Sequence, residues 1–355
     1  MKLEDFGYNE KLEEFRIENN LKDFEIGRVS SEHKERYIVI TEKGEQDAEI
    51  TGNLRFSSNN REDFPAVGDW VALTKYDSGA SIIHKVLPRF SIISRQNVGQ
   101  AGEKQIIATN IDFALLVQAV DRDFNINRLE RYLSICNSSK VNPIIVLTKI
   151  DLINEHFIAE IVEKIKARIK NVPVFTISNL SQEGYNTIKS IIEKGKTYCM
   201  LGSSGVGKST LLNNLSGKTI MRTNTISRNT KKGRHVTSHR QLIILETGGI
   251  LIDNPGIREV GIADSTTGLE ITFDKIVRLS QECKFKDCSH TNEIGCAVLE
   301  AIEKGEIDKA SYYNYLKLER ENAHFESTIK EKRKKDKEFG KSLKNYKKAM
   351  NKKKK

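Results

Sequence analysis

The sequence predicts a multi-domain protein that consists of an N-terminal all-β barrel, a central α/β domain and a C-terminal α-helical domain with a metal cluster. Three observations predict it: short alternating strands near the N-terminus, apolar strands alternating with amphipathic helices in the middle, and cysteines and a histidine crowded together beyond them. The expected divisions are an N-terminal extension at 1–23, the barrel at 24–98, the α/β domain at 99–270, the helical domain at 271–326 and a basic tail at 327–355.

The barrel is expected from runs such as EIGRV, RYIVITE and VGDWVALTKY, which alternate apolar and polar residues between turns. About five such strands suggest a small barrel, of which the OB-fold is the commonest and often binds nucleic acid. On the pattern alone, a barrel that packs on its neighbour and binds nothing fits equally well.

The α/β domain is expected from near-continuous apolar runs such as DFALLVQAV and NPIIVLTKID, which alternate with helical stretches such as FIAEIVEKIKARIK. This alternation is typical of a parallel sheet with helices on both faces.

A phosphate-binding loop follows the predicted strand YCML and matches G-x-x-x-x-G-K-[ST] at every fixed position. Its backbone N–H groups would point at the phosphates, and Lys208 would reach the β- and γ-phosphates. The Ser209 hydroxyl would ligate Mg²⁺. The nucleotide-binding residues expected here are Gly202, Ser203, Ser204, Gly205, Val206, Gly207, Lys208, Ser209 and Thr210.

The base-reading residues are expected upstream of this loop. Thr148, Lys149 and Asp151 resemble the N-K-x-D motif, with Thr in the first position. The carboxylate of Asp151 matches the paired N1–H and N2–H₂ donors of guanine, which adenine lacks, and Lys149 would lay its stem over the base. A second apolar strand ends at Ser178, where a loop that supports the base is expected. A P-loop ATPase or kinase is an alternative that Asp151 argues against.

Two switch segments are expected downstream. Asp253 and Gly256 match D-x-x-G, so that Asp253 would hold Mg²⁺ through water and the Gly256 N–H would sense the γ-phosphate. In the polar stretch before them, Thr237 would close on Mg²⁺ and the γ-phosphate. The motifs therefore occur in a circularly permuted order, with the base reader before the phosphate loop, which preserves a site when the original termini are adjacent.

The metal cluster combines three thiolates and one imidazole, the closed tetrahedral set of a structural Zn²⁺ site. Its residues are Cys283, Cys288, His290 and Cys296. The loop between them is too short to bury a core and would depend on the metal. Ordinary free cysteines are the alternative. Cys136 and Cys199 lie in apolar stretches and are expected in the core.

The net charge of +10 is concentrated in the tail. Residues 327–355 contain fourteen Lys or Arg and three Asp or Glu, a net charge of +11, which leaves −1 for the rest of the chain. Such a tail suits RNA anchoring, and a merely solvating tail is the alternative.

No apolar run reaches the roughly 18 to 20 residues that span a membrane, and the N-terminus is charged where a signal peptide would be apolar. We therefore expect a cytoplasmic protein without a membrane partner. A monomer is a separate expectation.

Together these motifs resemble the ribosome small-subunit-dependent GTPase A (RsgA) family of circularly permuted GTPases. The resemblance covers about 25 to 325 and includes VGDWV at 67–71 in the barrel and GRHVTSHR at 233–240. It implies an OB-fold that contacts ribosomal RNA and a role in completing the small ribosomal subunit. The chain departs from the family pattern at Asn179, where Ala is usual, at Val236, where Thr is common, and at Ile294, which replaces a frequent Pro.

The residue that would orient the attacking water is not at the position used by Ras-like GTPases, which carry a Gln directly after D-x-x-G. That position holds Ile257, an apolar residue that cannot orient water. The resemblance assigns the role to a switch histidine, here His235, two residues before Thr237. A solvated loop histidine without a role is the alternative.

The resulting prediction is a GTP hydrolase that binds the small ribosomal subunit and its rRNA and assists late maturation. Turnover of GTP to GDP and phosphate would be stimulated by the subunit and would drive release. One structural Zn²⁺, and Mg²⁺ with GTP, are the expected cofactors. The alternative is a GTP-regulated RNA-binding scaffold with negligible turnover.

Overall fold

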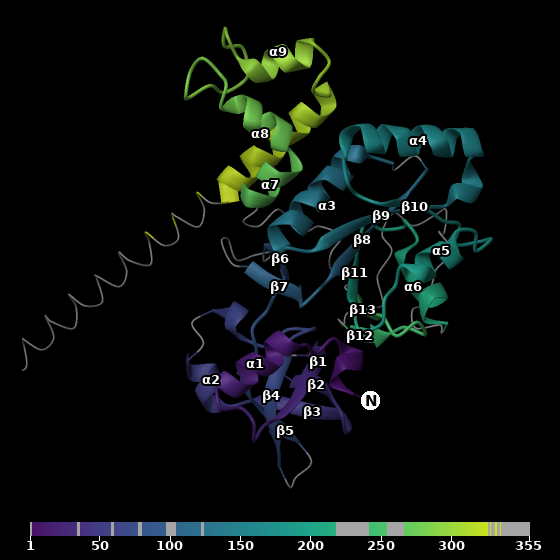
Figure 1. Cartoon of the computed structure of the whole chain (residues 1–355). Helices are drawn as coiled ribbons and strands as arrows, with labels where there is room; N and C mark the ends of the chain where they lie inside the picture. Colours follow the sequence, from purple (N-terminus) through teal and green to yellow (C-terminus); the bar gives the residue numbers. More distant parts are fainter. Residues whose placement is uncertain are drawn as a thin grey trace, which may run out of the picture.

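The computed structural model describes residues 2–33, 36–57, 60–76, 80–96, 104–121, 124–217, 241–253 and 266–325, together with 327, 331 and 334. The α/β domain lies between the barrel and a C-terminal group of helices (Figure 1). Among the described helices, none is long and apolar enough to cross a membrane.

The N-terminal barrel has five strands, as predicted. They are β1 (Glu25–His33), β2 (Arg36–Thr41), β3 (Gly44–Ile50), β4 (Trp70–Lys75) and β5 (Ser81–Val86). The strands follow the order β1-β2-β3-β5-β4, and pairing of β1 with β4 closes the barrel. Helix α2 (Gly52–Ser57) and the short helix η2 (Arg61–Asp63) connect β3 to β4. Fully buried Val29, Val39, Val71, Leu73 and Ile83 fill the interior.

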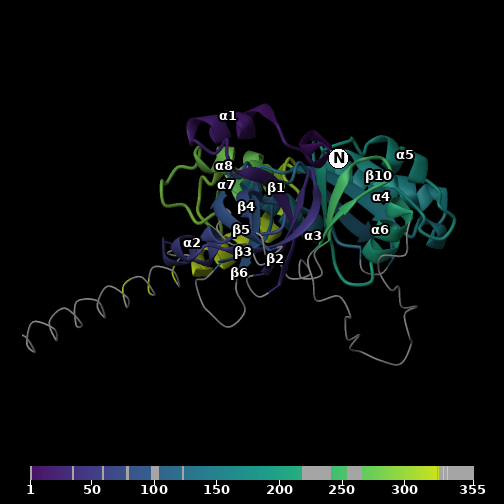
Figure 2. The same ribbon diagram turned by 90° about the horizontal axis from the view of Figure 1, so that it is seen from below.

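The N-terminal extension packs on this barrel. It contains η1 (Leu3–Phe6) and α1 (Glu10–Glu18), which begins at an Asn9 side chain that accepts a hydrogen bond from the Leu12 N–H. The Tyr8 ring meets Trp70 edge-on, with 5.0 Å between the ring centroids. The chain begins close to where the barrel meets the α/β domain (Figure 2), and Asp5 pairs there with Lys194 at 2.7 Å.

A two-stranded hairpin, β6 (Ile92–Gln96) and β7 (Lys104–Thr109), follows the barrel. Its two strands lie on either side of residue 98, where the division between the barrel and the α/β domain is expected. The domain divisions themselves stay predictions.

The α/β sheet has the order β10-β9-β8-β11-β13-β12. Its strands are β8 (Phe113–Ala119), β9 (Asn142–Thr148), β10 (Val174–Thr176), β11 (Thr197–Leu201), β12 (Gln241–Ile244) and β13 (Ile250–Asp253). All the pairings are parallel except that of β12 with β13. The carboxyl ends of β8, β9, β10, β11 and β13 therefore lie along one edge, where α/β proteins bind ligands.

Helices cover both faces of the sheet, as the alternating pattern predicts. Helices α3 (Ile126–Ser139) and α4 (Glu155–Arg168) pack on one face with Ala114, Leu116 and Ile145. Helices α5 (Tyr185–Ser190) and α6 (Lys208–Ser216) pack on the other with Leu115, Val117 and Val146. Successive β8 residues thus enter opposite cores, which explains its uninterrupted apolar run.

The barrel and the α/β sheet are joined edge to edge. Ser31 of β1 pairs antiparallel with Gln241 of β12, so the two sheets form one sheet of eleven strands. Beside this junction, buried Arg28 donates to the carbonyl oxygens of Phe6, Gly68 and Asn110 at 2.5, 3.1 and 3.0 Å. Arg28 therefore connects the extension, the barrel and the segment that leads into β8.

The C-terminal helices dock on α3. They are α7 (Thr266–Thr272), α8 (Asp274–Ser280), α9 (Ala297–Glu303) and the helical segment 309–325. Gly268 allows close approach, since a Cβ there would lie 2.1 Å from the Ser134 carbonyl oxygen. Nearby, the buried carboxylate of Glu130 accepts hydrogen bonds from Arg168, Ser311 and Asn314, each at 2.7 Å. Helix α3 therefore makes specific contacts with α7 at Gly268 and with the segment 309–325 at Glu130.

Candidate nucleotide site and metal centre

The phosphate loop joins β11 to α6 and depends on its glycines. Gly205 and Gly207 have φ of 80° and 95°, in the left-handed region that glycine enters without strain. A Cβ on Gly202 would lie 2.3 Å from the carbonyl oxygen of Val117. The loop therefore has the predicted position between strand and helix, and larger residues would distort it.

The Lys208 ammonium is held over this loop. Its Nζ donates to the carbonyl oxygens of Gly202 and Ser203 at 2.6 and 2.5 Å. Ser209 and Thr210 follow in the first turn of α6. The first turn of a helix presents backbone N–H groups and the positive end of its dipole, which suits phosphate.

The end of β9 meets the phosphate loop directly. Thr148 is fully buried, and its hydroxyl donates to the carbonyl oxygen of Val206 at 2.6 Å. Lys149 has φ of 61°, and its Nζ pairs with the Asp121 carboxylate at 2.7 Å. Thr148 and Val206 are 58 positions apart in the chain, and their contact brings the predicted base-reading segment beside the phosphate loop.

The Asp151 carboxylate is oriented by the loop after β10. Buried Ser178 donates its hydroxyl to Asp151 Oδ1 at 2.6 Å. The same hydroxyl oxygen accepts from the N–H groups of Leu180 and Ser181 at 3.1 Å each. The two predicted base-reading segments therefore form one unit that fixes the carboxylate.

Two residues near this unit were not predicted to be functional. Asp121 follows β8 and could have been found because the carboxyl end of that strand lies next to β9. Asn179 donates from Nδ2 to the Gly207 carbonyl oxygen at 3.1 Å. Its only signal in the sequence was the departure from the usual Ala.

The switch residues are only partly described. Asp253 ends β13, which pairs in parallel with β11 through Cys199 and Ile252. Asp253 is therefore at the same sheet edge as the phosphate loop. His235, Thr237 and Gly256 lie outside the described residues.

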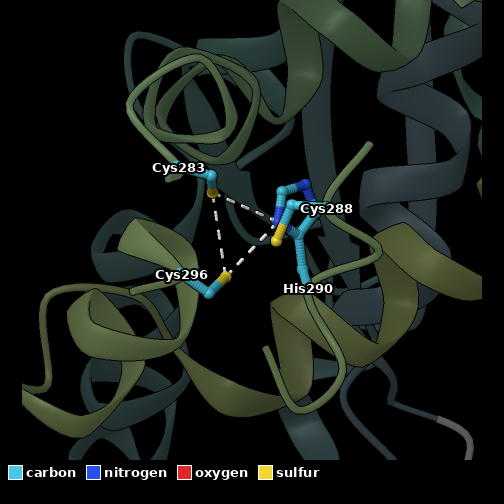
Figure 3. Close-up of side chains that lie close together, drawn as sticks. All are labelled: Cys283, Cys288, His290 and Cys296. Atoms are coloured by element: carbon cyan, nitrogen blue, oxygen red, sulfur yellow. Dashed lines mark hydrogen bonds between the residues drawn. The ribbon is translucent and has the colours of Figure 1, made fainter. Parts of the chain in front are cut away.

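The four predicted metal ligands converge (Figure 3). The ligand atoms of Cys283, Cys288, His290 and Cys296 all lie within 4.8 Å of one another. The Cys283 and Cys296 sulfurs are 3.8 Å apart, and His290 Nδ1 is 3.5 and 3.4 Å from them. Tetrahedral Zn²⁺ with Zn–S of about 2.3 Å and Zn–N of about 2.0 Å requires edges of about 3.8 and 3.5 Å. The donor set fits zinc in its chemistry, and the spacings among Cys283, His290 and Cys296 match these edges.

The surrounding helices hold this cluster in place. Cys296 is the N-cap of α9, where its sulfur accepts from the Leu299 N–H at 3.5 Å. The Tyr312 hydroxyl donates to the carbonyl oxygen of His290. The cluster thus connects α9 to the helical segment 309–325. Cys136 and Cys199 are fully buried core residues, as predicted, and burial raises the pKa of the Cys199 thiol to about 12.

The fold and the site define a circularly permuted GTPase with an N-terminal barrel and a C-terminal metal module. The sequence model of the RsgA GTPase family matches residues 86–263. The chain belongs to this family, whose members are GTP hydrolases.

Individual relatives extend the match over almost the whole chain. Small ribosomal subunit biogenesis GTPase RsgA 1 of Bacteroides thetaiotaomicron is 38% identical over 97% of this chain and 96% of the relative. The RsgA of Methanosarcina acetivorans is 42% identical over 88% and 83%. The crystal structure of YjeQ from Thermotoga maritima aligns with a TM-score of 0.62 at 26% identity, covering 86% of this chain and 98% of that one. The circularly permuted GTPase YloQ aligns with a TM-score of 0.58 at 26% identity, covering 87% and 96%.

Proposed function

We propose that this protein binds the small ribosomal subunit, assists its late maturation and hydrolyses GTP there to GDP and phosphate, which drives its own release. The observation that carries the proposal is the convergence of the base-reading and phosphate-binding residues at one sheet edge. The relatives named as small ribosomal subunit biogenesis GTPases support the choice of partner.

Separate groups would recognise the two ends of GTP. Asp151, already oriented by Ser178, would accept from N1–H and N2–H₂ of guanine. Lys149, held by Asp121, would cover the base plane. Lys208 and the backbone N–H groups of the phosphate loop would bind the phosphates.

The remaining groups would prepare the γ-phosphate for attack. Ser209 and Thr237 would hold Mg²⁺ directly and Asp253 through water, and the ion would neutralise charge on the phosphate oxygens. The Gly256 N–H would sense the γ-phosphate, and His235 would orient the attacking water.

The Cys₃His cluster would hold one structural Zn²⁺. Four protein ligands fill a tetrahedral coordination shell and leave no position for a substrate. The zinc would therefore stabilise the helical module and take no part in hydrolysis.

The barrel and the helical module would contact ribosomal RNA. On the barrel, Phe56 and Tyr76 are 94% and 56% exposed, and exposed aromatic rings can stack on unpaired bases. The basic tail would add salt-dependent contacts to phosphates. We further propose a cytoplasmic monomer, because a cysteine-ligated metal suits a reducing compartment and one chain supplies every ligand of the metal cluster.

GTP turnover with and without purified small ribosomal subunits tests the proposal. We expect a low rate for the protein alone and a much higher rate with subunits, since a partner that orders the first switch would complete the site. Tight, GTP-dependent subunit binding with no increase in turnover would instead support the RNA-binding scaffold.

A further inference from the structure

The loop after β10 is tied to the phosphate loop by the side chain of Asn179. Its Nδ2 donates to the carbonyl oxygen of Gly207 at 3.1 Å. A Cβ placed on Gly207 would lie only 2.4 Å from the same Nδ2. Asn179 therefore packs directly on the phosphate-loop backbone, from a segment 28 residues earlier in the chain.

Tyr185 and Asn214 hold the Asn179 amide in this orientation. The Tyr185 hydroxyl donates to Asn179 Oδ1 at 2.5 Å and accepts from Asn214 Nδ2 at 3.0 Å. Because Oδ1 faces this hydroxyl, Nδ2 is directed at Gly207. Burial raises the pKa of Tyr185 to about 12, so the hydroxyl keeps its proton at neutral pH. Asn214 lies on α6, the helix that begins at the phosphate loop. The hydrogen bonds among Asn179, Tyr185 and Asn214 therefore also join the loop after β10 to this helix.

Thr148 makes another hydrogen bond to the phosphate loop, at the residue before Gly207. Its hydroxyl has one proton to donate, and this proton is used by the carbonyl oxygen of Val206. The asparagine that begins an N-K-x-D motif has two N–H donors instead. In this chain, Asn179 supplies the additional donor, to the adjacent carbonyl of Gly207. Two side chains from the base-reading segments thus hold consecutive peptide groups of the phosphate loop.

From this geometry we infer that Asn179 is a positioning residue that couples the two ends of the nucleotide site. Through Gly207, it holds the phosphate loop in register with the loop that orients Asp151. Binding of the base then favours the loop shape that accepts the β-phosphate. The inference concerns guanine-nucleotide binding and does not rest on the ribosomal role, so its test uses the full chain without ribosomal subunits.

The test compares GDP with GMP, which share the base but differ in the β-phosphate. In Asn179→Ala, we expect the ratio of the GMP and GDP dissociation constants, measured by calorimetry, to fall about twofold to tenfold, the equivalent of one net hydrogen bond. Simple damage to the base-reading loop would weaken both ligands equally and leave the ratio unchanged.

Asn142→Ala is the matched control. It removes a side-chain amide that likewise donates to a backbone carbonyl, that of Asp112 at 3.1 Å, at the opposite end of β9. We expect its ratio to equal that of the unmodified protein. Tyr185→Phe keeps the ring but removes the hydroxyl that orients Asn179, and we expect a smaller fall. An unchanged ratio in Asn179→Ala, or an equal fall in the control, would overturn the inference. If Asn179→Ala does not fold, Tyr185→Phe alone decides, and an unchanged ratio there would overturn it.

Discussion

At the scale of single residues, contacts within the protein orient the charged side chains of the site. Lys149 is paired with Asp121 at 2.7 Å, and Asp151 accepts the Ser178 hydroxyl at 2.6 Å. Each partner comes from a different strand end, so the orientation depends on the folded sheet. Side chains fixed in this way lose less conformational entropy on binding, which increases affinity without an additional contact.

His235 is the residue proposed to orient the attacking water. In His235→Ala, we expect subunit-stimulated kcat to fall about a hundredfold, because the group that orients the attacking water is lost. GTP affinity should change little, since His235 is not one of the expected nucleotide-binding residues. Steady-state GTP turnover with saturating subunits measures the first quantity, and fluorescent nucleotide titration measures the second.

His156→Ala is the matched control for this prediction. His156 lies on α4 with a side chain that is 80% exposed, and its change should leave kcat unaltered. If His235→Ala hydrolyses GTP as fast as the unmodified protein, another residue orients the attacking water.

At the scale of elements, the metal cluster connects short helices that pack around a small apolar core. Helices α7, α8 and α9 have seven residues each, a length at which isolated helices are unstable in water. Cys296 caps α9, and Tyr312 reaches the His290 carbonyl. The folded state of this module should therefore depend on the metal.

Chelation of zinc tests this dependence. After metal removal, we expect amide protons of α9 and of 309–325 to lose protection against hydrogen exchange, because the ligands would no longer be held together. The strands β8 and β11 should keep theirs. Zn²⁺ should restore the protection and Mg²⁺ should not, since thiolates bind Mg²⁺ poorly. Unaltered protection in zinc-free protein would contradict a structural role for the metal.

One face of the helical segment 309–325 forms a groove of about 300 Å³ beside this cluster. It contains the 57% exposed Tyr313 together with Lys317 and Arg320. Neither cation has an ion-pair partner among the residues that the structure describes. The carboxylates of the same helix are engaged elsewhere: Glu319 accepts from Tyr315, and Glu321 pairs with Arg131. An aromatic ring flanked by available cations suits RNA.

Charge reversal in this groove is expected to weaken subunit binding. Lys317→Glu with Arg320→Glu should raise the dissociation constant about tenfold or more at low salt and reduce its salt dependence, because phosphate contacts are lost. Filter binding over a series of salt concentrations measures both. Lys166→Glu in an exposed position on α4 is the single-charge control. If the double variant has the salt slope of the control, the groove does not contact RNA.

At the scale of the whole molecule, the barrel is attached to the part of the sheet that lies between the two predicted switch segments. Strand β1 pairs with β12, which follows the predicted first switch, and β12 pairs with β13, which leads to the second. Arg28 reinforces this attachment through three carbonyl oxygens. Burial lowers its pKa to about 10, so it stays charged at neutral pH. Backbone hydrogen bonds therefore connect the barrel to the strands that border both predicted switch segments.

Replacement of Arg28 tests how firmly the parts are joined. Arg28→Met should lower the free energy of unfolding by about 3 kcal/mol, since charge-assisted bonds to three buried carbonyls are lost. Urea denaturation measures the change. Arg36→Met, at a site whose side chain is 82% exposed, should cost about 0.5 kcal/mol or less. Equal stability of the two variants would show that Arg28 contributes little to holding the barrel on the α/β domain.

Some parts of the site could be predicted from the sequence, and others could not. The positions of the phosphate loop, the predicted base-reading segment and the Cys₃His cluster could be inferred from the sequence, because their chemistry requires particular residues at fixed local spacing, as in 202–209. The partners Asp121, Asn179 and Glu130 were not, because their roles come from contacts between segments far apart in the chain. The five-stranded barrel was predictable from alternation, whereas its pairing with β12 was not.

The sequence alone determined the order of motifs, the class of nucleotide and the donor atoms of the metal centre, since these depend on residue types and short spacings. Only the tertiary structure decided how these parts are connected. The edge-to-edge joining of barrel and sheet, the buried Arg28 and the Asn179 bridge all depend on which surfaces meet after folding. Such contacts leave no periodic pattern along the chain, because each consists of one or two residues whose partners lie in other segments.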